Sequence, residues 1–277
     1  MGKSIRVAGN KVPVQRIVAP NGGPMTGPGT NSYLLGNQRL AIVDPGPAIP
    51  AHIDSLQAAL AGRRLEWILV THTHGDHSPA AAVLAKQTGA VLIGLAPINQ
   101  AHNDQTFQPQ RLFQHGEVLN FGEYVLEIIH TPGHVSNHFC YLLQEEGLLF
   151  TGDHILQGTT SVILPPDGDM GDYMASLQRL LDYPLQALAP GHGDIMAEPA
   201  MEISKLIRHR QQREAKVIAA LERSGPASLD TLTPIVYDDV ASHLLPWARR
   251  TLLAHLLKLA REDRAGESAD GWKLSGG

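Results

Sequence analysis

The run Thr71–His77 (THTHGDH) constrains the fold most, because it places four side chains that can ligate a metal within six residues. It follows the apolar stretch Trp67–Val70, typical of a buried strand, and precedes Ser78-Pro79, typical of a helix start. In an extended chain, residues two apart face the same way, so His72 and His74 can hold one metal ion. The turn at Gly75 then directs Asp76 and His77 toward a second position. The run predicts a strand, a metal-binding loop and a helix.

Three further loops each place one possible metal ligand next to a glycine, which permits unusual backbone angles. The loops are Thr131–His134 (TPGH), Thr151–His154 (TGDH) and Pro190–Gly193 (PGHG). Each one is a weak signal alone, since Gly-His and Gly-Asp occur in many turns. Following the THTHGDH run in this order, they form a strong set that adds His134, Asp153 and His192.

Short apolar runs rich in β-branched residues alternate with helical stretches up to about residue 198, which predicts an α/β domain. We expect helices at Ile53–Leu60, Ala80–Gln87 and Tyr173–Leu181, the second with Ser78 as N-cap and Gly89 as its stop. A long amphipathic helix over Met201–Arg223 ends at Ser224-Gly225-Pro226. Two more helices (Leu229–Val236, Trp247–Arg264) and a Gly271–Leu274 strand then suit a winged helix. The predicted domains are residues 1–223 and 224–277.

Composition excludes several classes of protein. With 277 residues, 43% of them hydrophobic, and a net charge of -5, the chain reads as an ordinary globular protein without a global pull toward polyanions. Residues 201–277 carry 12 basic and 10 acidic side chains, so only this part could dock a polyanion. One cysteine, Cys140, excludes a disulfide scaffold and an all-thiolate metal site, and we expect it to be buried. No segment reads as a signal peptide or a membrane span, so we expect a cytoplasmic protein that does not enter membranes.

The ligand set resembles that of the metallo-β-lactamase superfamily. The resemblance implies an α/β fold, the four-layer αββα sandwich, and two divalent metal ions, usually zinc, with iron or manganese as alternatives. In this implied assignment the first metal is held by His72, His74 and His134. The second is held by Asp76, His77 and His192, and Asp153 bridges the two.

Three other segments narrow the resemblance to the branch called β-lactamase-like protein 2, whose members carry a C-terminal winged-helix-like domain. They are Gly29–Leu34, Asp172–Leu180 and the residues His209-Arg210 and Arg213-Glu214 after the PGHG loop. In this branch, the mitochondrial member is a single-strand endoribonuclease, and related sequences hydrolyse thioesters. The resemblance therefore implies a hydrolase.

The residues themselves indicate the same chemistry. Two dications about 3.5–4 Å apart lower the pKa of a shared water and supply hydroxide near neutral pH. Asp76 could ligate with one oxygen and orient that hydroxide with the other, so we assign it the catalytic role. We expect hydrolysis of an ester, a thioester or a phosphodiester by a metal-bridging hydroxide, with a small molecule or single-stranded RNA as substrate. A homodimer is compatible with the sequence.

Two other functions remain open. The superfamily also includes iron-dependent sulfur dioxygenases, in which two histidines and an aspartate hold one iron. Alternatively, the winged helix could bind nucleic acid beside a vestigial metal site. Its last helix carries Arg249, Arg250, Lys258, Arg261 and Arg264, but its leucine stripe indicates packing or dimerisation.

Two groups of side chains have uncertain roles. His138 could orient a metal ligand or be structural. The arginines of the helix after the PGHG loop could hold a substrate phosphate or carboxylate, or form a solvated helix face; they are Arg208, Arg210 and Arg213.

Overall fold

The computed structural model describes residues 5–8, 11–98 and 102–275. The chain divides into two compact units. The first contains residues 1–131, 137–160 and 183–200, and the second contains residues 132–136, 161–182 and 201–277. The sequence-based division at residue 223 stays a prediction.

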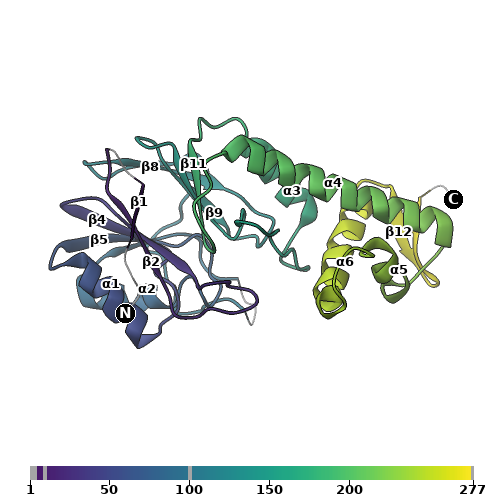
Figure 1. The fold of residues 1–277 in the computed structure, drawn as a ribbon, viewed down its shortest axis with the longest axis horizontal. Coiled ribbons are helices and arrows are strands. Elements are labelled where there is room, and N and C mark those ends of the chain that lie inside the picture. Colours follow the sequence, from purple (N-terminus) through teal and green to yellow (C-terminus); the bar gives the residue numbers. More distant parts are fainter. Residues whose placement is uncertain (1–4, 9–10, 99–101, 276–277) are drawn as a thin grey trace. The chain divides into compact units, whose positions relative to one another are not determined.

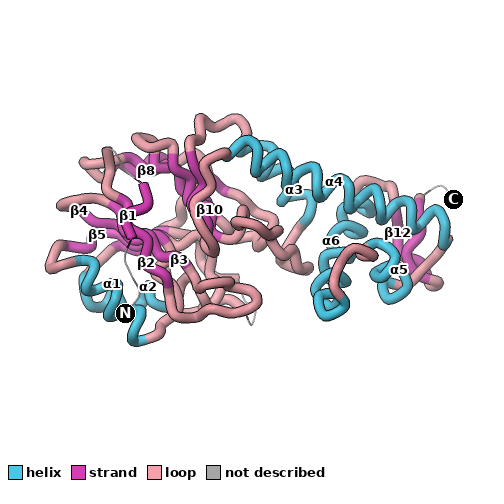
Figure 2. Tube along the Cα trace, in the orientation of Figure 1, coloured by secondary structure: helices cyan, strands magenta, loops and turns pink. Residues whose placement is uncertain are grey.

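The first unit is built on two β-sheets (Figures 1 and 2). The six-stranded sheet has the order β1-β2-β3-β4-β5-β6 and the five-stranded sheet the order β11-β10-β9-β8-β7. The first comprises β1 (Ile5–Ala8), β2 (Val14–Val18), β3 (Asn31–Leu35), β4 (Arg39–Val43), β5 (Arg64–Leu69) and β6 (Val91–Ile93). The second comprises β7 (Val118–Asn120), β8 (Val125–His130), β9 (Phe139–Leu143), β10 (Leu148–Gly152) and β11 (Ala187–Pro190).

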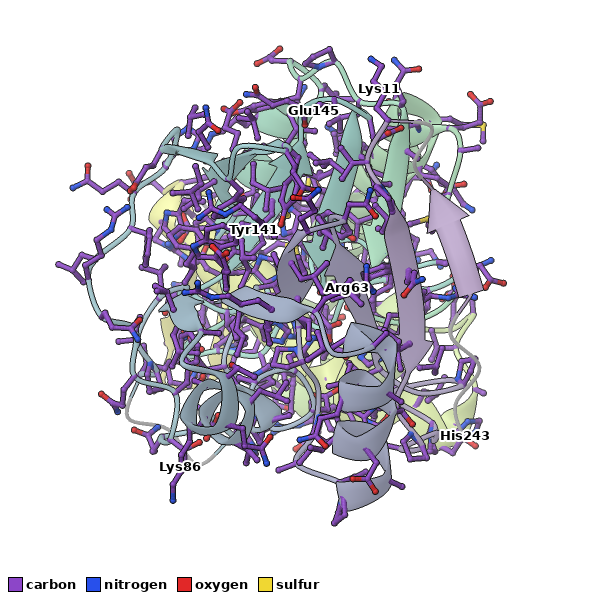
Figure 3. All side chains as sticks on the ribbon, turned by 90° about the vertical axis from the view of Figure 1, so that its left-hand side faces the viewer. Lys11, Arg63, Lys86, Tyr141, Glu145 and His243 are labelled. Carbon is purple, nitrogen blue, oxygen red and sulfur yellow. The ribbon has the colours of Figure 1, made fainter. Side chains whose placement is uncertain are left out.

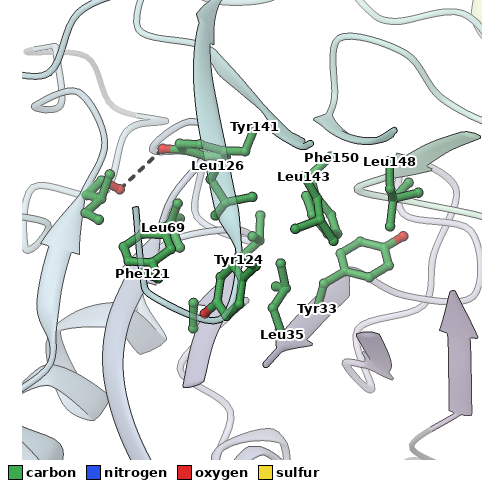
Figure 4. Close-up of a cluster of buried hydrophobic side chains, with 14 of the residues drawn as sticks. Tyr33, Leu35, Leu69, Phe121, Tyr124, Leu126, Tyr141, Leu143, Leu148 and Phe150 are labelled. Atoms are coloured by element: carbon green, nitrogen blue, oxygen red, sulfur yellow. Dashed lines mark hydrogen bonds between the residues drawn. The ribbon is translucent and has the colours of Figure 1, made fainter. Parts of the chain in front are cut away.

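Side chains from both sheets form one buried cluster, which fixes the two sheets face to face (Figure 4). The rings of Tyr33 on β3 and Phe150 on β10 lie 5.2 Å apart within it. The hydroxyl of Tyr141 donates to the carbonyl of Val70 over 2.8 Å, so this buried phenol is satisfied. Lys86 points outward in Figure 3, whereas Tyr141 is fully buried. Cys140, next to Tyr141 on β9, is buried as the sequence predicts, and burial raises its pKa to about 12.

A second cluster joins the other face of the six-stranded sheet to α1 (Pro50–Leu60) and α2 (Ala80–Thr88). Gly89 ends α2 with a φ of 74°, as expected. The prediction that Ser78 caps α2 is wrong. Pro79 occupies that position, and the Ser78 hydroxyl donates instead to Asp104 over 2.7 Å.

The second unit contains four α-helices and a two-stranded sheet among its described residues. They are α3 (Met170–Leu180), α4 (Pro199–Ser224, of which residues 201–224 belong here), α5 (Leu229–Val236), α6 (Leu245–Arg261), β12 (Ala265–Ser268) and β13 (Gly271–Leu274), with a 3₁₀ turn at Ser242–Leu244. One buried cluster joins the end of α4 to α5, α6 and Trp272 on β13. Three helices around a small hairpin confirm the predicted arrangement. No helix within the described ranges combines the length and the apolarity needed to cross a membrane.

The buried ring of His255 on α6 makes the second unit sensitive to acid. Burial lowers its pKa from 6.5 to about 4, although the Glu214 carboxylate opposes this change. The unfolded chain therefore takes up the proton first, and stability that is complete above pH 6.5 is lost as the pH falls toward 4. We expect about 2 kcal/mol less stability at pH 5 than at pH 7. Hydrogen exchange of the α6 amides at pH 5 and pH 7 measures this loss of stability. The variant His255→Leu should show no such loss between the two pH values. Equal exchange protection in the wild type at both values would contradict the expectation.

Candidate metal centre

The THTHGDH run leaves the six-stranded sheet directly after β5 and turns before α2. The His77 amide donates to the His74 carbonyl over 3.0 Å, which closes the turn. His72 Nε2 lies 3.0 Å from His74 Nδ1, so the two rings converge on one point as the alternation predicts. Both elements that flank the run are therefore those that the sequence predicts.

The five-stranded sheet supplies Asp153 and His192 from adjacent strands. β10 and β11 are parallel neighbours, so their carboxyl ends meet at one edge of the sheet. The Gly191 amide donates to the Gly152 carbonyl over 2.8 Å and joins the two loops. Gly191 is required here because a Cβ atom would lie 2.6 Å from the His77 ring and 2.8 Å from Asp153.

Two rings and two carboxylates meet in a compact cage formed by His77, His192, Asp76 and Asp153. In each of the four histidine–aspartate pairs, the ring Nε2 atom lies 3.3–3.5 Å from the nearer carboxylate oxygen. Ligand atoms about 2.0–2.2 Å from a tetrahedral metal lie roughly 3.3–3.6 Å from one another. These four separations and the donor types fit a divalent cation such as zinc, and Asp76, His77 and His192 each place one donor atom within 4.8 Å of the others.

Charge within the cage favours a cation. Burial raises the pKa of Asp76, but the His77 and His192 rings outweigh it and bring the value to about 2. Burial lowers the pKa of His192, whereas Asp153 and Asp76 raise it to about 9. The carboxylates are therefore ionised at neutral pH, and a cation that binds there displaces protons from the rings.

The first unit also brings a third group together: one donor atom each of His72, His77 and Asp153, all within 4.8 Å of one another. Asp153 therefore belongs to the cage and also lies close to a donor atom of His72. His134 belongs to the second unit, where its Nδ1 atom lies 2.6 Å from the Val162 carbonyl oxygen. Its predicted ligation with His72 and His74 stays a prediction.

Asp44 contacts both ends of the THTHGDH run, and the sequence analysis did not identify it. Its buried carboxylate accepts hydrogen bonds from the Thr71 amide (2.7 Å) and hydroxyl (2.8 Å), and lies 2.9 Å from His77 Nδ1. A carboxylate at Nδ1 leaves Nε2 of the same ring for a metal. The available signal was an acidic residue directly after the buried strand β4, before Pro45-Gly46.

His138 contacts one of the candidate ligands. Its ring stacks on His72 with centroids 5.2 Å apart, and its Nδ1 lies 2.8 Å from the Thr131 hydroxyl. This contact is compatible with both roles, so the orienting role of His138 stays a prediction.

The arginines after the PGHG loop lie in the second unit and differ in burial. Arg208 is exposed, which agrees with the interpretation that these arginines form a solvated helix face. That interpretation is wrong for Arg210 and Arg213, which are buried. Arg210 donates to the Ser161 carbonyl and lies over the Tyr173 ring, and Arg213 pairs with Asp239 at 2.8 Å.

Comparison with known proteins identifies two regions of the chain. Residues 25–192 match the model of the metallo-beta-lactamase superfamily, and residues 228–272 match that of the beta-lactamase associated winged helix domain. The chain belongs to the metallo-beta-lactamase superfamily. Members of this superfamily are usually hydrolases that bind divalent metals, and the His/Asp cluster fits a metal site.

Two relatives illustrate the similarity. The chain is 34% identical over 253 residues to the beta-lactamase-like protein 2 homolog of Caenorhabditis elegans, covering 89% of this chain and 82% of that protein. It is 30% identical over 265 residues to the lactamase-like protein aptB of Emericella nidulans, covering 91% and 82%. The resemblance to the β-lactamase-like protein 2 branch is therefore confirmed.

Solved structures share the fold at lower identity. A beta-lactamase domain protein from Burkholderia ambifaria superposes with a TM-score of 0.81 at 20% identity, covering 99% of this chain and 94% of that one. A metallo-beta-lactamase family protein from Thermus thermophilus gives 0.73 at 22% identity, covering 96% and 98%. The predicted α/β metallo-β-lactamase fold with a C-terminal winged helix is confirmed.

Proposed function

We propose that the chain is a dinuclear metal-dependent hydrolase. The cage of His77, His192, Asp76 and Asp153 carries this proposal, because its donor separations match those around a tetrahedral dication. His72 and His74, completed by His134, would hold the other ion, with Asp153 shared between the two. Two bound dications would supply Lewis acidity and hydroxide near neutral pH.

Asp76 is the most exposed of the four cage residues. Its side chain is 28% exposed, whereas that of His77 is fully buried and that of His192 is 8% exposed. The Asp76 oxygen Oδ2 faces both rings, which leaves Oδ1 to accept a hydrogen bond from an attacking water and to aim it at the substrate. Substrate would therefore approach past Asp76.

The charges of the second unit favour an ester or a thioester over RNA. Glu214 lies 2.7 Å from Lys258 and 3.1 Å from Arg264, so one carboxylate neutralises part of both side chains. Arg249 lies 2.6 Å from Asp230, and Arg261 pairs with Asp169. RNA phosphates would compete with these carboxylates, and affinity for nucleic acid depends largely on phosphate neutralisation. A vestigial metal site beside a nucleic-acid module is disfavoured by the same pairs.

An iron-dependent sulfur dioxygenase needs only one metal position. The cage offers a second position with both Asp76 and His192 in place, which supports two metals. Zinc, a cytoplasmic location and a homodimer stay predictions.

Elemental analysis of the purified protein, with parallel assays on an acyl thioester and on single-stranded RNA, tests the proposal. We expect two divalent ions per chain and thioester turnover that a chelator abolishes and zinc restores. RNA cleavage that weakens steeply between about 50 and 200 mM salt would instead assign the winged helix to substrate binding. One iron per chain with oxygen uptake on a persulfide would overturn the hydrolase.

A further inference from the structure

The Gly/Pro-rich loop Asn21–Thr30 (NGGPMTGPGT) contacts two residues of the cage. The Asn21 side chain closes this loop, because its Oδ1 accepts from the Thr30 amide and its Nδ2 donates to the Thr30 hydroxyl oxygen, both over 2.9 Å. The Thr30 hydroxyl is fully buried and already accepts from Asn21. Its own proton therefore needs another acceptor.

That acceptor is Asp76. Thr30 Oγ1 lies 3.2 Å from Asp76 Oδ2, the oxygen that also faces the rings of the cage. A hydroxyl that donates to a carboxylate forms a charge-assisted hydrogen bond. The chain Asn21 to Thr30 to Asp76 thus fixes the rotation of the Asp76 carboxylate and leaves Oδ1 on the open side.

The same loop contacts His192. The Gly29 carbonyl oxygen lies 3.3 Å from His192 Nδ1, which favours the tautomer that leaves Nε2 for a metal. Gly29 has a φ of +137°, and a Cβ atom there would lie 2.0 Å from the Ala19 carbonyl, so only glycine fits. Asn31 extends the contact, because its side chain donates to the carbonyls of Pro190 (2.9 Å) and Gly193 (2.8 Å) on both sides of His192.

We propose that the Asn21–Thr30 loop is an outer clamp for the second metal position and that Thr30 is the positioning residue for Asp76. This inference rests on the proposed function, since it takes Asp76 and His192 as ligands. Losing such an outer hydrogen bond usually lowers metal affinity or activity by about 10- to 100-fold. The clamp should therefore control binding of the second metal equivalent while the first is unchanged.

The test titrates metal-free protein with zinc against a chromogenic chelator and measures kcat and KM. Thr30→Val, which keeps the shape and removes the hydroxyl, should weaken the second equivalent by about 10- to 100-fold and lower kcat with little change in KM. Thr30→Ser, which keeps the hydroxyl, should retain the wild-type affinity for the second equivalent and the wild-type kcat. Thr88→Val is the matched control, because the half-buried Thr88 hydroxyl donates to the Leu84 carbonyl over 2.8 Å within α2, outside the Asn21–Thr30 loop.

Asn21→Asp provides a second variant that spares the core. It retains an acceptor for the Thr30 amide but offers the Thr30 hydroxyl a carboxylate in place of a donor, which draws its proton away from Asp76. We expect the same loss of second-metal affinity. If both variants bind the second equivalent as tightly as the wild type, the clamp is overturned. If the wild type itself binds fewer than two equivalents, the dinuclear proposal fails and the clamp fails with it.

Discussion

Asp153→Ala is expected to release at least one metal equivalent and to lower kcat/KM by about a thousandfold or more. The Asp153 Oδ1 atom lies 3.3 Å from His77 Nε2 and 3.4 Å from His192 Nε2, so its removal opens the cage. In the dinuclear proposal it is also shared with the other metal position, and both positions lose a ligand. Lewis-acid stabilisation of a transition state supplies several kcal/mol, and about 1.36 kcal/mol corresponds to tenfold in rate.

Metal content and kcat/KM are measured on Asp153→Ala, on Asp153→Asn and on Asp54→Ala. Asp54 is exposed on α1, so its variant should keep the metal content and rate of the wild type. Asp153→Asn retains the shape of the side chain and removes its charge, so it should follow the alanine variant if charge and ligation matter. Full activity in Asp153→Ala would contradict the two-metal mechanism.

The position of the site was predictable because local patterns define it. The THTHGDH run lies between a buried strand and a helix, and β5 and α2 flank it in the structure. Asp153 and His192 each follow a buried strand, and the parallel pairing of β10 with β11 brings these strand ends together. Sequence periodicity and turn residues carry this information over a few residues at a time.

Contacts between distant segments were not predictable in the same way. Asp44 precedes its partner His77 by 33 residues, and the contact exists only because β4 and β5 are adjacent. The hydroxyl of Ser78 is a good N-cap locally, but Asp104 on another loop binds it instead. Arg210 and Arg213 look like solvated helix residues until partners from other segments bury them. Tertiary partners override local preference in each case.

Asp44→Asn is expected to weaken the second metal position and to lower kcat/KM by about 100-fold, although it changes only one atom. Asp44 has a φ of +49°, and asparagine tolerates this left-handed backbone, so strain does not confuse the result. The carboxylate oxygen Oδ2 lies 2.8 Å from the Thr71 hydroxyl and 2.9 Å from His77 Nδ1. An amide nitrogen in its place would donate to Nδ1, which moves the ring proton to Nε2 and blocks the atom that faces the cage.

The other orientation of the asparagine amide does not rescue the site, because its NH₂ group would then face the Thr71 amide, which is 2.7 Å from Oδ1. Two donors would oppose each other in a buried place, at a cost of about 1–3 kcal/mol in the free energy of unfolding. Zinc competition, kcat/KM and urea denaturation of Asp44→Asn measure the three effects, with Asp54→Asn as the exposed control. If the variant binds the second equivalent with wild-type affinity, the orientation of His77 does not depend on Asp44. Joint loss of affinity and rate, with a smaller loss of stability, would show that this buried carboxylate sets the tautomer on which the cage depends.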